Sequence, residues 1–297
     1  MVLSINNLSK QYGNLMALSN VSFSIEKGSV FGILGPNGSG KTTTLGIVLG
    51  VINSSGGSFS WFEETPTNNP RKKIGAILET PNFYHYLSAY KNLQIAADIK
   101  GVSYDNIERI LEVVNLKDRK DHQFSTFSLG MKQRLSIASA LLADPEVLVL
   151  DEPTNGLDPQ GIAEIRELII SISKQGKTII LASHMLDEVE KVCTHVAVLQ
   201  KGKILTSGKV SEILGNDDII EIVADDLQQL EVLSKAHPSI KSVSKNTAGK
   251  LELIFVNPVS ASQINDYFHN KGIILSHLVL RKKSLEAQFL QLTSQGK

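Results

Sequence analysis

The chain has 297 residues, of which 42% are hydrophobic, so it is long enough for one large domain and a smaller one with packed cores. Lysine plus arginine equals aspartate plus glutamate at 30 each, and the zero net charge argues against a nucleic-acid-binding surface spread over the whole protein. The single cysteine, Cys193, excludes an internal disulfide and fits a reducing compartment.

The first two thirds of the chain alternate short apolar runs with helix-compatible stretches, as parallel α/β sheets do. The predicted strands are Val2–Leu8, Val30–Leu34, Lys73–Leu78, Val147–Leu150, Thr178–Ala182 and His195–Gln200. The fourth and fifth are almost wholly apolar, which is typical of central strands covered on both faces. Residues 87–142 are mainly helix-compatible, with predicted helices at Tyr104–Val114 and Met131–Leu142. They indicate a helical insertion between two halves of the sheet.

The pattern changes near Gly215. The predicted elements that follow are strands Ile219–Val223, Ile240–Lys245, Leu251–Val256 and Ile273–Leu280, and helices Leu227–Ala236 and Ser260–Lys271. Their order, βαββαβ, is typical of a small ferredoxin-like module, and a final helix is predicted around Leu285–Leu292. We therefore expect a large domain over residues 1–214, with a helical subdomain at about 85–142, and a small α+β domain over residues 215–297.

No segment of the sequence is expected to cross a membrane. The first residues, MVLSINNLSKQYG, lack the basic and then apolar pattern of a secretory signal. The longest apolar runs, such as EVLVLDEP and KTIILAS, fall well short of the roughly 18–20 residues that a bilayer crossing needs. A membrane role would therefore depend on docking to another protein.

A complete phosphate-binding pattern, G-x-x-x-x-G-K-[ST], follows the strand Val30–Leu34. Its residues are Gly35, Pro36, Asn37, Gly38, Ser39, Gly40, Lys41 and Thr42, and Thr43 follows them in the helix that begins near Lys41. Glycines let the backbone fold around a phosphate with its N–H groups inward, and the helix N-terminus adds a favourable dipole. We expect Lys41 to reach the β- and γ-phosphates of a nucleotide and the Thr42 hydroxyl to hold Mg²⁺.

Two carboxylates follow the apolar run Val147–Leu150, at the edge where open α/β sheets bind ligands. Asp151 is placed to hold Mg²⁺, directly or through water, and Glu152 to polarise an attacking water. With the phosphate-binding turn, they indicate a nucleotidase. Because the sequence has no Asn-Lys-x-Asp string of the kind that recognises guanine, ATP is favoured over GTP.

A third segment narrows the class. It is Phe127-Ser128-Leu129-Gly130-Met131-Lys132-Gln133-Arg134, which resembles the LSGGQ-type signature of ABC ATPases. It departs from that pattern at Phe127, Leu129 and Met131 but keeps the serine, the glycine and the Gln-Arg pair. The resemblance implies that Ser128 and Gly130 touch the γ-phosphate of ATP held by a second copy. A hydroxyl, N–H groups and a helix N-terminus are suited to binding that anion.

Three further segments lie where this family has them, and the resemblance covers roughly Met1 to Leu214. The string TNGLD, ending at Asp158, is similar to the D-loop, which implies that Asp158 lies at the dimer seam. The string LASH, ending at His184, is similar to the switch-histidine motif, which implies that His184 contacts the γ-phosphate. Tyr12 is similar to the aromatic residue that stacks on adenine.

One position departs from the usual family pattern. Where the Q-loop offers a glutamine to the metal and the lytic water, this chain has Glu79, in the string ILETPNFY. The substitution places an anion near Mg²⁺, or it is a neutral change in a tolerant loop. The Glu-Thr pattern and the LGMK signature resemble ATPases of bacitracin- and lantibiotic-resistance exporters. That resemblance implies an ABC-2 type exporter of a drug, a peptide or a lipid-like substrate.

The family resemblance implies an α/β fold class: a P-loop NTPase of the ABC ATPase type with a helical subdomain, plus the small ferredoxin-like α+β domain. It implies a homodimer that closes around two MgATP, and an integral-membrane permease of ABC-2 type that docks near Phe83–Leu93. The chain would lie on the cytoplasmic, inner face of the cell membrane, with no nucleic-acid partner. The implied catalytic residues are Glu152, His184, Lys41 and Glu79, and the implied metal ligands are Thr42, Asp151 and Glu79.

Two other functional classes remain open. The first is a soluble ABC ATPase that acts outside transport, on ribosomes or DNA; the chain has one cassette, no charged linker and no sustained heptad run. The second is a binding protein without catalysis, against which the intact catalytic positions argue. Cosedimentation with membranes or with ribosomes separates transport from the first class, and phosphate release tests the second.

Overall fold

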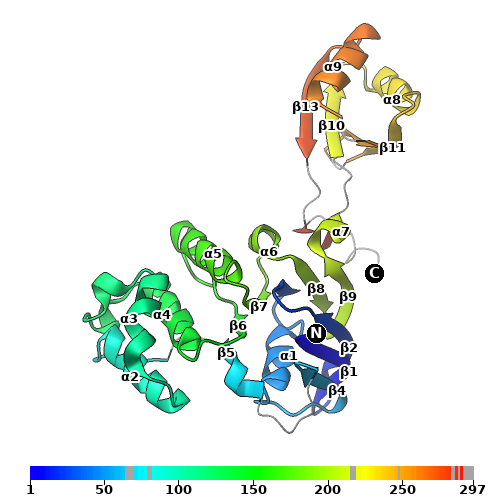
Figure 1. Cartoon of the computed structure of the whole chain (residues 1–297). Coiled ribbons are helices and arrows are strands. Elements are labelled where there is room, and N and C mark those ends of the chain that lie inside the picture. The colour runs from blue at the N-terminus through cyan, green and yellow to red at the C-terminus, as the bar shows by residue number, and fades with distance from the viewer. Residues whose placement is uncertain are drawn as a thin grey trace. The chain divides into compact units, whose positions relative to one another are not determined.

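The computed structural model describes residues 1–63, 70–78, 82–214, 219–246, 248–257, 259–281, 285–286 and 288–289. The chain divides into two compact units, Met1–Val210 and Ser211–Lys297 (Figure 1). Each unit has a hydrophobic core of its own. Within the part of the chain that the structure describes, no helix combines the length and apolar character that a membrane crossing requires.

A six-stranded sheet organises the first unit. Its strands are β3 (Val30–Leu34), β5 (Ile74–Ile77), β6 (Val147–Asp151), β7 (Thr178–Ser183), β8 (His195–Gln200) and β9 (Lys203–Lys209), in the spatial order β5-β6-β7-β3-β8-β9. The pairs are parallel except that β9 runs antiparallel to β8. Every residue of β3, β6 and β7 is buried, which explains why these strands are almost wholly apolar in sequence.

A three-stranded antiparallel sheet packs into the same core. Its strands are β1 (Leu3–Tyr12), β2 (Leu15–Ile25) and β4 (Gly56–Trp61), in the order β2-β1-β4. The rings of Phe23 on β2 and Phe31 on β3 stack with centroids 5.2 Å apart. The indole Nε1 of Trp61 donates to the carbonyl oxygen of Val48, the last residue of α1 (Lys41–Val48), at 2.7 Å. The helix that follows the phosphate-binding turn is thus anchored at its far end.

The helical group of the first unit lies between β5 and β6 in the chain and appears as a separate cluster of helices in Figure 1. Its main helices are α2 (Ala89–Lys100), α3 (Ile107–Val113) and α4 (Leu129–Leu141), and its short 3₁₀ turns are η2 (Tyr104–Asn106), η3 (Lys117–Arg119) and η4 (Phe124–Thr126). Arg134 joins two of these helices, because its Nη1 donates to the carbonyl oxygens of Val114 and Asn115 at the end of α3.

The remaining elements of this unit are η1 (Pro70–Lys73), α5 (Pro159–Ser173) and α6 (Leu186–Val192), and α7 (Val210–Leu214) follows β9 in the chain. Asp158 caps the N-terminus of α5: its carboxylate accepts from the N–H of Gly161 at 2.8 Å, and proline occupies the first helical position. Its buried residues fall at helical spacing, and they are Gly161, Ile165, Leu168, Ile169 and Ile172. The helix therefore packs firmly along one face.

The second unit is a four-stranded antiparallel sheet with two helices. Its elements are β10 (Ile219–Ala224), α8 (Leu227–Lys235), β11 (Ile240–Lys245), β12 (Leu251–Phe255), α9 (Ala261–Asn270) and β13 (Leu275–Arg281), with sheet order β11-β12-β10-β13. This order and the βαββαβ sequence of elements give the ferredoxin-like arrangement. The apolar face of the sheet, with Ile222 and Leu253, packs against Leu230 of α8 and Phe268 of α9.

The strands predicted at Val30–Leu34, His195–Gln200 and Ile240–Lys245 match β3, β8 and β11 in both bounds. The predicted strand Val2–Leu8 is too short, since β1 continues to Tyr12. The strands β2, β4 and β9 were not predicted at all. Most of the predicted final helix, around Leu285–Leu292, lies outside the described residues.

Lys177 ties the start of β7 to the loop before β6. Its Nζ lies 2.7 Å from Oδ1 of Asp144 and donates to the carbonyl oxygen of Pro145 at 2.8 Å. The hydrogen bond from Lys177 lowers the pKa of Asp144 below its ordinary value, although burial raises it. This ion pair should therefore make stability depend on pH.

The Lys177→Met variant is expected to lose no more than about 1 kcal/mol of unfolding free energy at neutral pH, because the Asp144 carboxylate is exposed and screened by water. A carboxylate whose pKa folding lowers stabilises the protein above its unfolded pKa, and the contribution is lost as pH falls through the folded pKa. The difference between wild type and variant should therefore shrink below about pH 4. Urea unfolding over a pH series measures it, and a difference that persists in acid contradicts the assignment.

Candidate active site

The turn between β3 and α1 requires glycine at two positions. Gly35 has φ 153°, and a Cβ there would collide with the carbonyl oxygen of Leu199. Gly40, the residue before α1, has φ 109°, and a Cβ would lie 2.5 Å from Cδ2 of Leu18. No side chain caps this helix. The first N–H groups of α1 are therefore available to an anion, and the helix dipole favours one.

Ser39 lies inside this turn and is 2% exposed. Among the described residues, its hydroxyl oxygen Oγ finds no hydrogen-bond partner. A buried hydroxyl left in that state costs about 1–3 kcal/mol. A phosphate oxygen placed in the turn would accept from this hydroxyl, so the turn suits a phosphate group.

Lys41 begins α1 and is only 5% exposed. Its Nζ donates to the carbonyl oxygens of Gly35 at 2.8 Å and Pro36 at 3.2 Å. The same atom lies 3.2 Å from Oε1 of Glu152. The ammonium group is thus held beside the turn, where it adds a full positive charge for phosphate groups.

Glu152 joins the phosphate-binding turn to the end of β7. It follows Asp151 at the end of β6 and has φ 46°, a left-handed conformation that is strained for a side chain of this size. Its Oε2 lies 2.9 Å from Nδ1 of His184 and accepts from the backbone N–H of His184 at 3.4 Å. Because a carboxylate only accepts, Nδ1 of His184 carries a proton. Lysine, glutamate and histidine form one connected set.

Asp151 is 5% exposed at the C-terminal end of β6, and Thr42 lies in the first turn of α1. A carboxylate and a hydroxyl are the hard oxygen donors that Mg²⁺ takes in nucleotide sites, where substrate phosphates and waters complete its coordination. The donor set therefore fits a magnesium ion, which Asp151 and Thr42 would hold and which would neutralise phosphate charge.

Tyr12 lies at the tip of the hairpin formed by β1 and β2, paired in register with Leu15. Tyr12 is 45% exposed, and Nζ of Lys10 lies 4.8 Å from its ring centroid. Leu15 and Met16 are exposed next to it in sequence. The tip therefore offers an exposed aromatic and apolar surface of the kind on which a planar base stacks.

A separate hollow, of about 420 Å³, lies where α4 and α5 begin. Ser128 caps α4 by accepting from the N–H of Met131 at 3.3 Å, and Asp158 caps α5. Both residues line the hollow together with Gly130. None of the described residues that line it belongs to the phosphate-binding turn. The predicted site residues thus fall into two groups on this chain.

Similarity to known proteins shows the family of this chain. Residues 18–155 match the family model described as ABC transporter. The ABC transporter ATP-binding protein YhcH of Bacillus subtilis is 38% identical, over 100% of this chain and 97% of its own length. The bacitracin transport ATP-binding protein BcrA of Bacillus licheniformis is 36% identical over 99% and 98%. The lantibiotic transport ATP-binding protein SrtF of Streptococcus pyogenes is 40% identical over 74% and 99%.

The chain belongs to the ABC transporter ATP-binding proteins. Solved structures agree: an ATP-binding subunit of an ABC transporter has a TM-score of 0.63 at 30% identity and covers 72% of this chain and 92% of its own. The cbiO1 protein from Clostridium perfringens has a TM-score of 0.65 at 30% identity and covers 71% and 90%. The protein is thus an ATP-binding, ATP-hydrolysing subunit of an ABC transporter with the P-loop NTPase fold.

One site residue proposed for the ATPase, Glu79, lies outside the described residues. Asn92 is a feature that the sequence analysis missed. It is 2% exposed on α2, where its Oδ1 accepts from the N–H of Tyr84 and its Nδ2 donates to the carbonyl oxygens of Tyr84, Leu87 and Ser88. The signal in the sequence was a lone asparagine on the buried face of an amphipathic helix.

Asn92 shapes a hollow of about 450 Å³ at the surface of the helical group. The described residues that line it are Asn82, Phe83, Tyr84, Asn92, Ile95, Ala96, Ile99 and Ser139. Two of them, Tyr84 and Ile99, are large apolar side chains that remain exposed, and Ile99 is 82% exposed. Phe83 instead packs edge-on against Phe124, so its ring supports the hollow from within the helical group.

Proposed function

We propose that the ATPase drives an ABC-2 type exporter through a separate integral-membrane permease, with a drug, a peptide or a lipid-like molecule as cargo. The observation that carries this proposal is the similarity to the bacitracin transport protein over 99% of the chain, because it includes the C-terminal unit as well as the ATPase core. The ATPase would work on the cytoplasmic face of the membrane that holds the permease.

The proposed catalytic unit contains two copies of the chain. In each copy the turn from Gly35 to Thr43 binds the phosphates of ATP, and Tyr12 stacks on adenine. Ser128 and Gly130 of the opposite copy complete the site from the second hollow, with Asp158 at the seam between copies. This division explains why one chain carries the predicted site residues in two groups.

The proposed chemistry assigns one task to each member of the connected set. Lys41 offsets the negative charge that develops on the transferred phosphoryl group. Glu152 orients the attacking water and accepts its proton. His184 contacts the γ-phosphate and is oriented by its own bond to Glu152. Thr42 and Asp151 would hold Mg²⁺, and Glu79 is proposed to contribute to the same metal and water.

We further propose that the permease docks in the hollow beside α2. Its exposed tyrosine and isoleucine side chains offer apolar area to a short helix of the partner, while Asn92 fixes the wall from inside. Tyr86, which is 69% exposed and contacts Tyr84 edge-on, extends the apolar surface. Residues 83–93, predicted to dock, therefore supply part of the surface, and Ile95, Ala96 and Ile99 supply the rest.

Affinity purification of the tagged chain from detergent-solubilised membranes, followed by mass spectrometry, tests this proposal. We expect a polytopic partner of about six membrane-spanning helices, the number implied by the family resemblance. Recovery in the soluble fraction alone, with ribosomal proteins or with none, would refute export and leave the ATPase chemistry intact.

The amount of permease that co-purifies with the Ile99→Asp variant is expected to be at least about tenfold lower than with the wild type, because a charge in an apolar contact is left desolvated. Its ATPase activity without the partner should stay unchanged, since Ile99 is not among the residues proposed to bind or hydrolyse ATP. Ile274→Asp is the matched control, because Ile274 is 80% exposed on the C-terminal unit. If the wild type, Ile99→Asp and Ile274→Asp all recover the same amount of permease, this hollow is not the docking site.

A further inference from the structure

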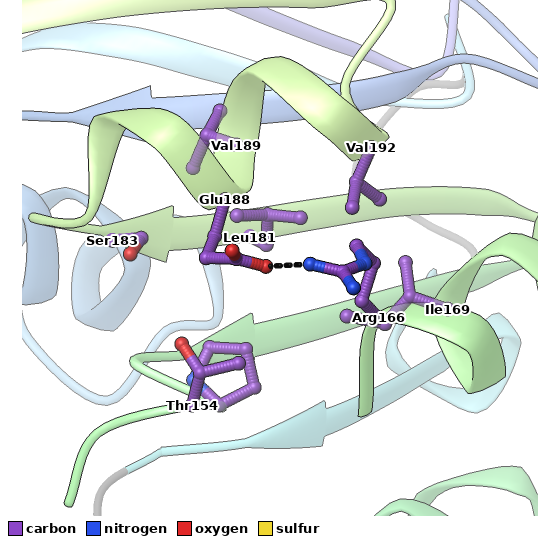
Figure 2. Close-up of a pocket in the computed structure, with 9 residues that line it drawn as sticks. Thr154, Arg166, Ile169, Leu181, Ser183, Glu188, Val189 and Val192 are labelled. Carbon is purple, nitrogen blue, oxygen red and sulfur yellow. Dashed lines mark hydrogen bonds and ion pairs between the residues drawn. The ribbon is translucent and has the colours of Figure 1, made fainter. Parts of the chain in front are cut away.

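Helices α5 and α6 face each other across a narrow pocket above β7 (Figure 2). Asp158, proposed to lie at the seam between two copies, caps the start of α5, and α6 starts two residues after His184. Apolar side chains from both helices line the pocket, among them Ile169, Val189 and Val192. The pocket therefore separates the helix that meets the second copy from the helix that follows the switch histidine.

An ion pair crosses this pocket. Nη1 of Arg166 on α5 donates to Oε2 of Glu188 on α6 at 2.7 Å, and Figure 2 shows the two side chains pointing at each other. Both are largely buried, with side-chain exposures of 26% and 15%. Oε1 of Glu188 accepts from Lys191 at 2.8 Å. Burial raises the pKa of Glu188, but the bonds from Lys191 and Arg166 outweigh it and hold the pKa below its ordinary value.

A second contact joins the segments that precede these two helices, nearer the catalytic residues. Oγ1 of Thr154, two residues after Glu152, lies 3.7 Å from Sδ of Met185, the residue after His184. The backbone N–H of Met185 donates to Oγ of Ser183 at 3.0 Å. The segment around His184 is thus connected to the segment after Glu152 at one end and to α5 at the other.

Helix α6 is the shorter of the two helices. It has only seven residues, too few to be stable alone, and Val189 is the residue of α6 that is buried. Helix α5 has 15 residues and a full buried face. Because apolar side chains of similar volume often stabilise a core as well as a part-buried charge pair does, stability alone does not account for this pair. Its distinctive property is a fixed geometry between the two helices.

We propose that Arg166 and Glu188 are positioning residues that couple Asp158 at the seam to His184 at the γ-phosphate. A second copy that presses on the start of α5 then sets the place of α6, and with it the histidine that Glu152 holds. The pair controls the rate of ATP hydrolysis and not the affinity for ATP. This inference rests on the two-copy site of the proposed function.

The test uses the full-length chain and measures phosphate release against both ATP and protein concentration. Arg166→Met, which keeps the apolar stem, is expected to lower kcat about tenfold, within the usual range of coupling between sites. The KM for ATP and the protein concentration at half-maximal specific activity should change by less than about twofold, because the variant leaves the phosphate-binding turn intact and weakens the transition state through the position of His184. Glu188→Gln is a milder second variant with the same expected direction.

Two comparisons keep the proposal open to refutation. The exchanged pair, Arg166→Glu with Glu188→Arg, is made together with Lys191→Met, so that no lysine opposes the new arginine. It should recover kcat to within about threefold of the wild type, since it restores the attraction. Lys177→Met is the matched control, because it breaks an ion pair of the same 2.7 Å length away from the pocket and should leave kcat unchanged. An unchanged kcat in both single variants, or a loss of kcat that the exchange does not recover, overturns the coupling.

The dependence of wild-type specific activity on protein concentration tests the proposed two-copy site separately from the coupling. Specific activity that rises with protein concentration supports a site shared between two copies. Specific activity that is independent of protein concentration, from a chain that stays monomeric with MgATP by size-exclusion chromatography, refutes that shared site and the coupling with it. If the specific activity of the wild type rises with protein concentration and Arg166→Met is fully active, the coupling is refuted and the shared site is not.

Discussion

The Glu152→Gln variant is expected to bind ATP with nearly unchanged affinity and to hydrolyse it at least about 100-fold more slowly than the wild type, the usual contribution of a general base. An amide does not accept a proton from water at neutral pH, so the step assigned to Glu152 is lost. Phosphate binding depends on the turn and on Lys41, which the substitution leaves in place. Dimers that hold ATP should therefore accumulate.

The local geometry explains why glutamine is the right replacement. It has the same shape, so the left-handed backbone at residue 152 costs the same as in the wild type. Its oxygen can still accept from Lys41, but its NH₂ group then faces Nδ1 of His184, which carries a proton in the wild type. The histidine must move its proton to Nε2, which also changes the group it offers to a phosphate. Glutamine thus affects both residues at once.

Glu146→Gln is the matched control for this experiment. Glu146 lies at the other end of β6, where it pairs with Lys27 and Lys73, so the substitution removes a paired carboxylate next to the same strand. Its hydrolysis rate should equal that of the wild type. Single-turnover phosphate release and size-exclusion chromatography with ATP measure the two properties. Rapid hydrolysis by Glu152→Gln would exclude Glu152 as the base.

The parts of the fold that could be predicted are those whose sequence pattern is visible within a single segment. The central strands are apolar throughout because both faces are covered, and that pattern is visible without any partner. β4 and β9 contain glycine, serine and lysine at exposed positions, so their conformation follows from pairing with β1 and β8. Pairing between distant segments cannot be deduced from a short window of sequence.

The active site divides in the same way. The phosphate-binding turn was predictable because Gly35 and Gly40 occupy backbone conformations that need glycine, so the motif carries its own geometry. The contact between Lys41 and Glu152 joins residues more than a hundred positions apart and was not predicted. Neither was the pair of Arg166 and Glu188, whose helices give no sequence sign that they face each other.

Lys41→Ala is expected to weaken ATP binding at least about 100-fold. Hydrogen bonds between charged groups contribute about 1.5–3 kcal/mol each, and two lost bonds to phosphate at the lower limit correspond to this factor. The lower limit applies because Lys41 must give up part of its bonding to Gly35, Pro36 and Glu152 to reach a phosphate. Isothermal titration calorimetry with ATP in the presence of Mg²⁺ measures the loss.

A loss of binding has to be separated from a loss of folding, because Lys41 is buried. Alanine leaves the carbonyl oxygen of Gly35 without this donor, which is expected to lower the unfolding free energy by about 1–3 kcal/mol. That loss leaves most of a domain's stability intact, so thermal unfolding should still be cooperative. Lys27→Ala, at an exposed lysine, should keep the wild-type affinity. If Lys41→Ala folds and binds ATP as tightly as that control, the turn from Gly35 to Thr42 is not the phosphate site.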